Sequence, residues 1–227
     1  MKQLLAQYNS LTGTIPTEYG DLVSLENLYL ANNRLSGSIS PFLGNLKNLD
    51  ILYLEGNMLL GIIPSSFGSL SNLTQMLLND NNLSGTIPAS LGNLSKLEYM
   101  FLYKNSLAGT IPDSIGGLSA LVLLFMEENY LSGTIPSSLG NLDSLIQLSL
   151  NNNSLTGSIP PSLGTLIANG TLQLAWFHGN DLTGVVPEDF CLLDGGYSAR
   201  GNELLKFDCS EALCGCSCNC SSNATTN

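Results

Sequence analysis

The feature that most constrains this chain is a repeat with a fixed period of 24 residues. It is clearest in segment 145–160, LIQLSLNNNSLTGSIP, where leucines, an asparagine, a glycine and an Ile-Pro pair stand at fixed offsets. Counting back from Ile159 in steps of 24 reaches an isoleucine each time: Ile135, Ile111, Ile87, Ile63, Ile39 and Ile15. A period in the twenties predicts a solenoid, in which each coil buries its apolar side chains against its neighbours. We therefore expect one elongated array.

Each coil opens on the pattern L-x-x-L-x-L, as in Leu49, Leu52 and Leu54. Successive side chains of a strand point to opposite faces, so the last two leucines should face the core and the residue between them should face outward. Stacking the coils then makes a parallel sheet.

An asparagine follows each strand at the same offset. A buried amide is tolerated only when its donors and acceptors are satisfied, and coils spaced roughly 4.8 Å apart allow it to bond to adjacent turns. The sequence predicts a structural asparagine ladder made of Asn9, Asn33, Asn57, Asn81, Asn105, Asn129, Asn153 and Asn180.

The unit L-x-x-L-x-L-x-x-N-x-L-x-G-x-I-P-x-x-L-G-x-L resembles the plant-type leucine-rich repeat of receptor-like kinase and receptor-like protein ectodomains and of polygalacturonase-inhibiting proteins. The resemblance covers residues 1–187, with eight N-x-L-x-G units of which the first is incomplete. It implies an α/β solenoid: a right-handed superhelix with a parallel concave β-sheet, a second short strand near G-x-I-P, and short convex helical or 3-10 segments. It also implies recognition on the concave face.

Three segments depart from the repeat. Ile39-Ser40-Pro41 displaces the proline by one position, and the spacing from Pro160 to Pro187 is 27 residues instead of 24. We expect the extra residues, within 167–171, to bulge on the convex side. Met1 falls where a first strand leucine belongs and no cysteine-paired cap precedes it, so the array looks as if its beginning is missing.

The repeat fades after Pro187 into a cysteine-rich segment, 188–220, followed by a tail, 221–227, that we expect to be disordered. The segment resembles the C-terminal caps of secreted and membrane leucine-rich-repeat proteins, in a style closer to algal ones. All six cysteines lie here: Cys191, Cys209, Cys214, Cys216, Cys218 and Cys220. Disulfides are the favoured interpretation, with fifteen pairings possible, although the C-x-C-x-C-x-C run could bind a soft metal through thiolates. We expect no metal and no cofactor.

Disulfides and N-glycosylation sequons both favour an extracellular or cell-surface protein. An Asn- and Ser-rich repeat also produces sequons by chance, so each one alone is weak. The segment 1–10 lacks the apolar run of a signal peptide, and no apolar run reaches the roughly 20 residues that cross a bilayer. We expect no membrane insertion by this chain, while a longer parent protein could still be anchored. The sequons are Asn72, Asn82, Asn93, Asn152, Asn169, Asn219 and Asn223.

Charge and motifs exclude several function classes. The chain has 18 acidic and 7 basic residues and a net charge of −11, which argues against nucleic acid as a partner. Its single histidine, His178, has no acid or nucleophile at a recognisable spacing, and there is no P-loop, dinucleotide fingerprint or kinase signature. We therefore expect a protein that is not an enzyme.

The outward residue between the two inward leucines forms a column up the concave sheet, and five of its eight members are aromatic: Leu5, Tyr29, Tyr53, Leu77, Phe101, Phe125, Ser149 and Trp176. Further aromatic and acidic side chains lie beside it. Exposed aromatic rows rimmed by charge commonly bind peptides and carbohydrates. The alternative is that bulky residues in this column only stabilise the sheet, ring on ring. The predicted ligand-binding residues are Tyr29, Tyr53, Tyr99, Phe101, Tyr103, Phe125, Glu127, Glu128 and Trp176.

The sequence thus favours a non-catalytic extracellular interaction module for a peptide, protein or glycan, in a receptor-like role, with the acidic rim favouring a basic partner. One alternative is an inhibitor of a secreted hydrolase, as in polygalacturonase-inhibiting proteins. A less favoured one is an ice- or wall-surface binder, using a column of hydroxyls that Ile62 and Val185 interrupt: Thr14, Ser38, Thr86, Thr110, Thr134 and Ser158.

Overall fold

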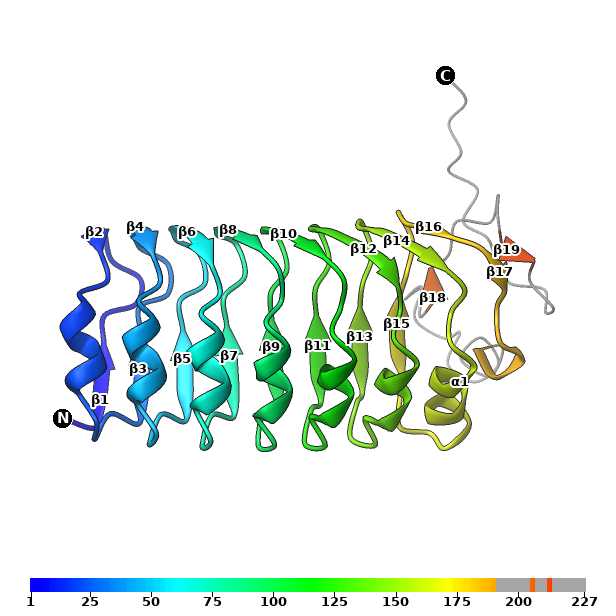
Figure 1. The fold of residues 1–227 in the computed structure, drawn as a ribbon, viewed down its shortest axis with the longest axis horizontal. Coiled ribbons are helices and arrows are strands. Elements are labelled where there is room, and N and C mark those ends of the chain that lie inside the picture. The colour runs from blue at the N-terminus through cyan, green and yellow to red at the C-terminus, as the bar shows by residue number, and fades with distance from the viewer. Residues whose placement is uncertain (191–204, 207–211, 214–227) are drawn as a thin grey trace, which may run out of the picture.

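A computed structural model of the chain describes residues 1–190, 205–206 and 212–213. The coils stack side by side from the N-terminus onward, with strands in one row, helical turns in another, and a second row of strands along one edge (Figure 1). The elongated array of stacked coils that the 24-residue period predicts is confirmed.

The concave side is a nine-stranded parallel sheet in the order β1-β3-β5-β7-β9-β11-β13-β15-β18. Adjacent strands pair one coil apart, as in Leu28 opposite Leu52 and Leu52 opposite Met76. These three side chains are fully buried, as the pattern predicted. The strands are β1 (Gln3–Leu5), β3 (Asn27–Tyr29), β5 (Ile51–Tyr53), β7 (Gln75–Leu77), β9 (Tyr99–Phe101), β11 (Leu123–Phe125), β13 (Gln147–Ser149), β15 (Leu174–Trp176) and β18 (Leu205–Lys206).

A second parallel sheet runs along the solenoid. In each coil its strand follows the turn that ends the strand of the first sheet, which confirms the second strand that the resemblance implied. Its central glycines have positive φ, for example +77° at Gly109, which is why a glycine recurs there. A short pair, β17 (Gly184–Val185) and β19 (Ala212–Leu213), follows. The sheet contains β2 (Thr12–Thr14), β4 (Arg34–Ser38), β6 (Met58–Ile62), β8 (Asn82–Gly85), β10 (Ser106–Gly109), β12 (Tyr130–Thr134), β14 (Ser154–Gly157) and β16 (Asp181–Leu182).

The convex side carries a row of short helical turns. In the coil whose proline is displaced by one position, to Pro41, the Ser40 hydroxyl accepts a hydrogen bond from the Phe42 N–H at 3.3 Å and so caps the turn. The turns are η1 (Thr17–Asp21), η2 (Pro41–Asn45), η3 (Ser65–Ser69), η4 (Ala89–Asn93), η5 (Asp113–Gly117), η6 (Ser137–Asn141), α1 (Pro161–Ala168) and η7 (Glu188–Phe190).

The three extra residues near 167–171 lengthen the helical turn of their coil into the eight-residue helix α1. Leu163, Leu166 and Ile167 are buried at helical spacing, and the exposed Asn169 forms the C-cap. The expected convex bulge therefore takes the form of a packed helix that ends at the sequon.

From Asn33 to Asn180 the asparagines make the same hydrogen bonds in coil after coil, whereas Asn9 is exposed and its amide donates only to Ala6 and Gln7 of its own turn. The Asn57 side-chain amide donates to the Leu30 and Leu54 carbonyls, each at 3.0 Å, and its oxygen accepts from the Leu35 N–H at 3.0 Å. Each such side chain therefore joins two successive coils while satisfying its own buried polar atoms.

The six cysteines and the sequons Asn219 and Asn223 lie outside the described residues. Among the helices that the structure does describe, none has the length and apolar character needed to cross a membrane.

Candidate functional site

The outward column on the nine-stranded sheet is mostly half-buried. Tyr29, Tyr53, Phe101, Phe125 and Trp176 all keep part of their surface in water. Because the strands alternate faces, these rings stand on the opposite side of the sheet from the buried leucines. They are available to a ligand without any rearrangement of the core.

Tyr29 and Tyr53 form the first aromatic group. Their ring centroids lie 5.0 Å apart with the planes at 87°, an edge-to-face contact. The Tyr53 hydroxyl also donates a hydrogen bond to the Gln75 side-chain oxygen. Burial of this phenol, followed by the nearby Tyr29 and Glu55, raises the pKa of Tyr53. Leu77 on β7 separates this pair from the next group.

Phe101 is the centre of the second group. Its ring stacks on Phe125 with centroids 4.8 Å apart, and its centroid lies 6.4 Å from that of Tyr99 and 6.2 Å from that of Tyr103. Such contacts are what the sheet-stabilising alternative predicts. The four rings nevertheless remain partly exposed, so the same packing also holds them in fixed positions for a ligand.

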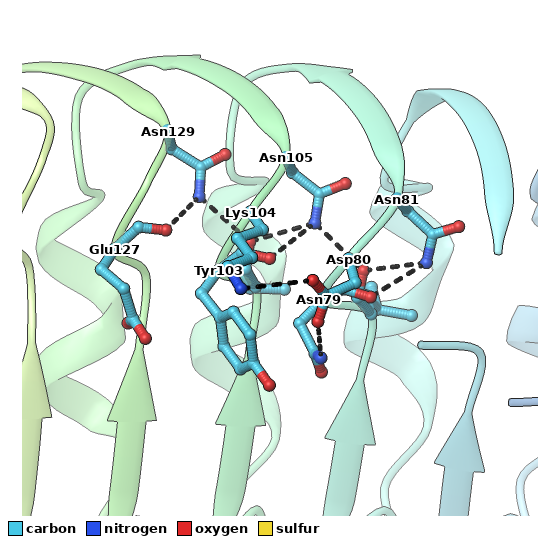
Figure 2. Close-up of polar contacts among 10 residues, drawn as sticks. Asn79, Asp80, Asn81, Tyr103, Lys104, Asn105, Glu127 and Asn129 are labelled. Atoms are coloured by element: carbon cyan, nitrogen blue, oxygen red, sulfur yellow. Dashed lines mark hydrogen bonds and ion pairs between the residues drawn. The ribbon is translucent and has the colours of Figure 1, made fainter. Parts of the chain in front are cut away.

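Acidic side chains lie where these strands end. In Figure 2 the side chains of Asn79, Tyr103 and Glu127 extend in one direction below the asparagine ladder. The Asn79 amide donates to an Asp80 carboxylate oxygen at 2.8 Å, and the Lys104 ammonium lies 3.8 Å from the other oxygen of Asp80. Both partners of that ion pair are well exposed, so the pair leaves the acidic character of the rim largely intact.

The turn after each strand contains a residue with positive φ. Glycine occupies this position at Gly56 and Gly179, whereas Asp80, Lys104 and Glu128 adopt φ of 52°, 50° and 54°. A non-glycine residue in this region costs about 1 kcal/mol or more. Charged side chains are therefore held at the rim in spite of local backbone strain.

Two carboxyl groups of the rim are only partly hydrated. Burial is the main cause that raises the pKa of Glu55 and of Glu127, and the neighbouring carboxylates of Asp80 and Glu128 respectively raise it further. The Oε2 atoms of both residues are buried and accept no hydrogen bond from the described part of the chain. A cationic ligand group would supply the missing partner.

A cavity of about 470 Å³ lies beyond the second aromatic group, between β11 and β15. Phe125 and Trp176 line it together with Glu127 and Glu128. The structure thus brings four of the nine predicted ligand-binding residues into one cavity. The remaining five belong to the two aromatic groups, Phe101 being stacked directly on Phe125.

Four residues of the cavity lie outside the predicted ligand-binding set, although the sequence analysis places one of them, Ser149, in the outward column. Gln147, Ser149 and Asn151 lie on one coil, and His178 lies on the next. Ser149 interrupts the aromatic column, and that small residue was the available signal of a gap between two rings.

The described residues contain no group of three or more His, Cys, Asp or Glu side chains placed to hold a metal ion.

Family models match much of the chain. One described as "Leucine rich repeat" matches residues 71–131, one described as "Leucine Rich repeats (2 copies)" matches 23–68, and one described as "Leucine Rich Repeat" matches 144–166.

Solved structures of plant receptors resemble the chain. A TDR receptor is 36% identical, with a TM-score of 0.82, over 94% of this chain and 35% of its own. The ectodomain of the Arabidopsis receptor kinase HAESA, in complex with an N-terminally extended IDA peptide hormone, is 38% identical, with a TM-score of 0.78, over 91% of this chain and 33% of its own. The chain thus spans about a third of the length of these receptors.

A plant ice-binding protein is also similar, with 30% identity and a TM-score of 0.76, over 93% of this chain and 65% of its own. No curated protein sequence matches the chain.

Proposed function

The chain belongs to the leucine-rich-repeat family, and we propose that it is a non-catalytic extracellular recognition module that binds a peptide or an extended protein segment along its concave sheet. The observation that carries this proposal is the line of half-exposed aromatic groups on the sheet, which ends in a cavity with an acidic rim. Rings fixed by their neighbours offer large contact area at low entropic cost. The acidic rim selects a basic ligand over an acidic one.

The position of the sequons supports this choice of face. Four of the five sequons in the described residues lie on the second sheet or on the convex side, and the fifth, Asn152, lies in the turn after β13, next to the cavity-lining Asn151. Glycans attached at the other four sites would leave the aromatic sheet uncovered. The five sequons are Asn72, Asn82, Asn93, Asn152 and Asn169.

The similarity to a receptor ectodomain that binds a peptide hormone supports a peptide ligand. The chain spans about a third of that ectodomain, and the inference drawn from the similarity is the class of ligand, a peptide.

Selection from a random peptide display library on the immobilised chain tests the proposal. We expect enrichment of basic peptides, and we expect the variant Tyr53→Ala/Phe101→Ala to lose most of their binding. The matched control is Phe42→Ala/Tyr130→Ala, which removes two rings that are 56% and 65% exposed on the convex side and on the second sheet. Equal binding by the wild type and the Tyr53/Phe101 variant would remove the concave sheet as the site.

Two outcomes would favour other functions. Selective binding of oligosaccharides without peptides would assign the aromatic column to a glycan. Stable co-purification with a secreted hydrolase, together with loss of that enzyme's activity, would favour an inhibitor.

One observation favours a second candidate, the ice-binding function. The six hydroxyl residues Thr14, Ser38, Thr86, Thr110, Thr134 and Ser158 are all exposed along the second sheet, and a plant ice-binding protein shares the fold. Strand β6 breaks this surface, because Met58, Leu60 and Ile62 are all about half exposed or more and are apolar. Thermal hysteresis of the purified chain decides the matter: its presence supports this candidate, and its absence removes it.

A further inference from the structure

Ser149 creates a gap between two aromatic walls. It pairs in register with Phe125 on one side and with Trp176 on the other, so the strands that carry the two rings lie two strand spacings, or roughly 9.6 Å, apart. The serine is only 5% exposed, because it lies at the bottom of the gap. Phe125, Ser149 and Trp176 all line the cavity, so two of its walls are aromatic and Ser149 lies between them.

The polar end of this cavity holds a carboxylate with unused hydrogen-bonding capacity. The Ser149 hydroxyl donates to the Asn151 side-chain oxygen at 2.7 Å and also lies beside the Glu127 carboxyl, yet it has one proton to give. The Oε2 atom of Glu127 is buried and accepts no hydrogen bond from the described residues. Burial accordingly raises the pKa of Glu127.

We propose that this cavity binds the guanidinium group of an arginine side chain, held between Phe125 and Trp176 and paired with Glu127. The proposal rests on the proposed function of the concave sheet, and it specifies one side chain of the ligand. A guanidinium is planar, stacks on aromatic faces and presents several N–H donors in a fixed fork. The carboxylate of Glu127 accepts hydrogen bonds from part of that fork. The side-chain oxygens of Gln147 and Asn151, which also line the cavity, are further acceptors.

Other occupants fit the same atoms less well. A neutral aromatic side chain would fill the gap but would leave the buried Glu127 oxygen without a partner. A lysine ammonium would pair with the carboxylate but lacks the flat face that two rings can cover. The arrangement therefore discriminates between arginine and both of these.

Trp176 is the one tryptophan in the sequence, so its fluorescence reports directly on the cavity. The probe is N-acetyl-arginine amide, titrated into the whole chain in about 0.15 M salt to screen non-specific attraction to the acidic protein. We expect a saturable fluorescence change, and a binding constant weaker by about tenfold or more for the neutral isostere N-acetyl-citrulline amide. N-acetyl-lysine amide should bind with intermediate strength.

Two variants test the named residues. Glu127→Gln keeps the shape of the side chain and removes its charge, and we expect it to weaken arginine binding about tenfold. Ser149→Leu fills the bottom of the gap and should remove the saturable response. The matched control is Glu55→Gln, which removes a carboxylate with the same buried, unpartnered oxygen at the equivalent position of another coil, away from the cavity. Circular dichroism confirms that each variant folds.

Equal responses to arginine and citrulline amides, or unchanged arginine binding in Glu127→Gln, would overturn the proposal. These outcomes are distinguishable from failure of the proposed function. If library-selected peptides need Tyr53 and Phe101 but carry no arginine and ignore Glu127→Gln, the concave sheet stands and the guanidinium site falls. If arginine amide binds while the selected peptides ignore Tyr53→Ala/Phe101→Ala, the concave-sheet function falls.

Discussion

The side-chain oxygen of Asn105 accepts a hydrogen bond at 2.9 Å from the backbone N–H of Leu83, one coil earlier. The Asn105 amide also donates to the Leu78 carbonyl of that earlier coil at 3.0 Å and to Leu102 and Tyr103 of its own turn. One side chain thus satisfies buried backbone groups of two coils, which is why the repeat keeps an asparagine there.

We expect Asn105→Ala to lower the free energy of unfolding by about 2–4 kcal/mol, because it leaves a buried N–H and several carbonyls without partners. Urea denaturation followed by circular dichroism measures this. Asn9→Ala is the control, since Asn9 is exposed and its amide bonds to Ala6 and Gln7 of its own turn. Equal losses in the two variants would contradict the inter-coil role.

Neighbouring glycines on the convex side should differ sharply. A Cβ at Gly116 would lie 2.3 Å from the Ser138 carbonyl oxygen of the next coil, whereas a Cβ at Gly117 would meet its nearest atom, the Gly92 oxygen, at 3.4 Å. We expect Gly116→Ala to destabilise the fold by about 1–3 kcal/mol and Gly117→Ala to change stability by less than about 0.5 kcal/mol. Thermal unfolding of the two variants compares them, and similar melting temperatures would show that the coils can separate without penalty.

Glu55 should make stability depend on pH. Its pKa is raised by burial, so the folded state retains the proton more strongly than the unfolded state does. The stabilisation is complete below the unfolded pKa of about 4.3 and is lost as pH rises through the folded pKa. Above that range Glu55→Gln should stabilise the fold by a few tenths of a kcal/mol to about 1 kcal/mol, since water screens this partly exposed carboxyl.

Denaturation of the wild type and Glu55→Gln at several pH values tests this difference. The two proteins differ only at residue 55, so the difference between their stability curves reports on the Glu55 carboxyl. If Glu55→Gln were more stable than the wild type only at acidic pH, the result would contradict a raised pKa for Glu55.

The Tyr29 and Tyr53 rings should be energetically coupled. Their edge-to-face contact predicts a coupling free energy of about 0.5–1.5 kcal/mol in a double-mutant cycle to alanine. Tyr29 and Phe101 serve as the control pair, because they stand on β3 and β9 with two strands between them and should be nearly additive. Additive effects in both pairs would show that the contact between Tyr29 and Tyr53 does not stabilise the sheet.

The period made the strands, the core and the ladder predictable, because each coil repeats the contacts of the last. Leu52 and Asn57 could be placed from their offsets alone. Helix α1 could not, because the expected bulge assumed that three extra residues leave the turn unchanged. Pro161 at its start and the spacing of Leu163, Leu166 and Ile167 instead allow a full helix to bury the inserted segment.

The site was predictable only as a column of outward residues. Offsets identify Phe125, Ser149 and Trp176 as neighbours, but the space between the rings depends on how Phe125 packs against Phe101. The burial of the Glu127 carboxyl likewise depends on the residues around it in three dimensions, and a repeat pattern carries no such information.

Hydroxyl-radical footprinting by mass spectrometry, with and without a library-selected peptide, tests the central claim most directly. We predict protection of Tyr53, Phe101 and Trp176 on the concave sheet, while Phe42 and Tyr130 on the other faces stay as reactive as in the free chain. Protection of Phe42 or Tyr130 with no change on the concave sheet would contradict the claim that this sheet is the recognition surface.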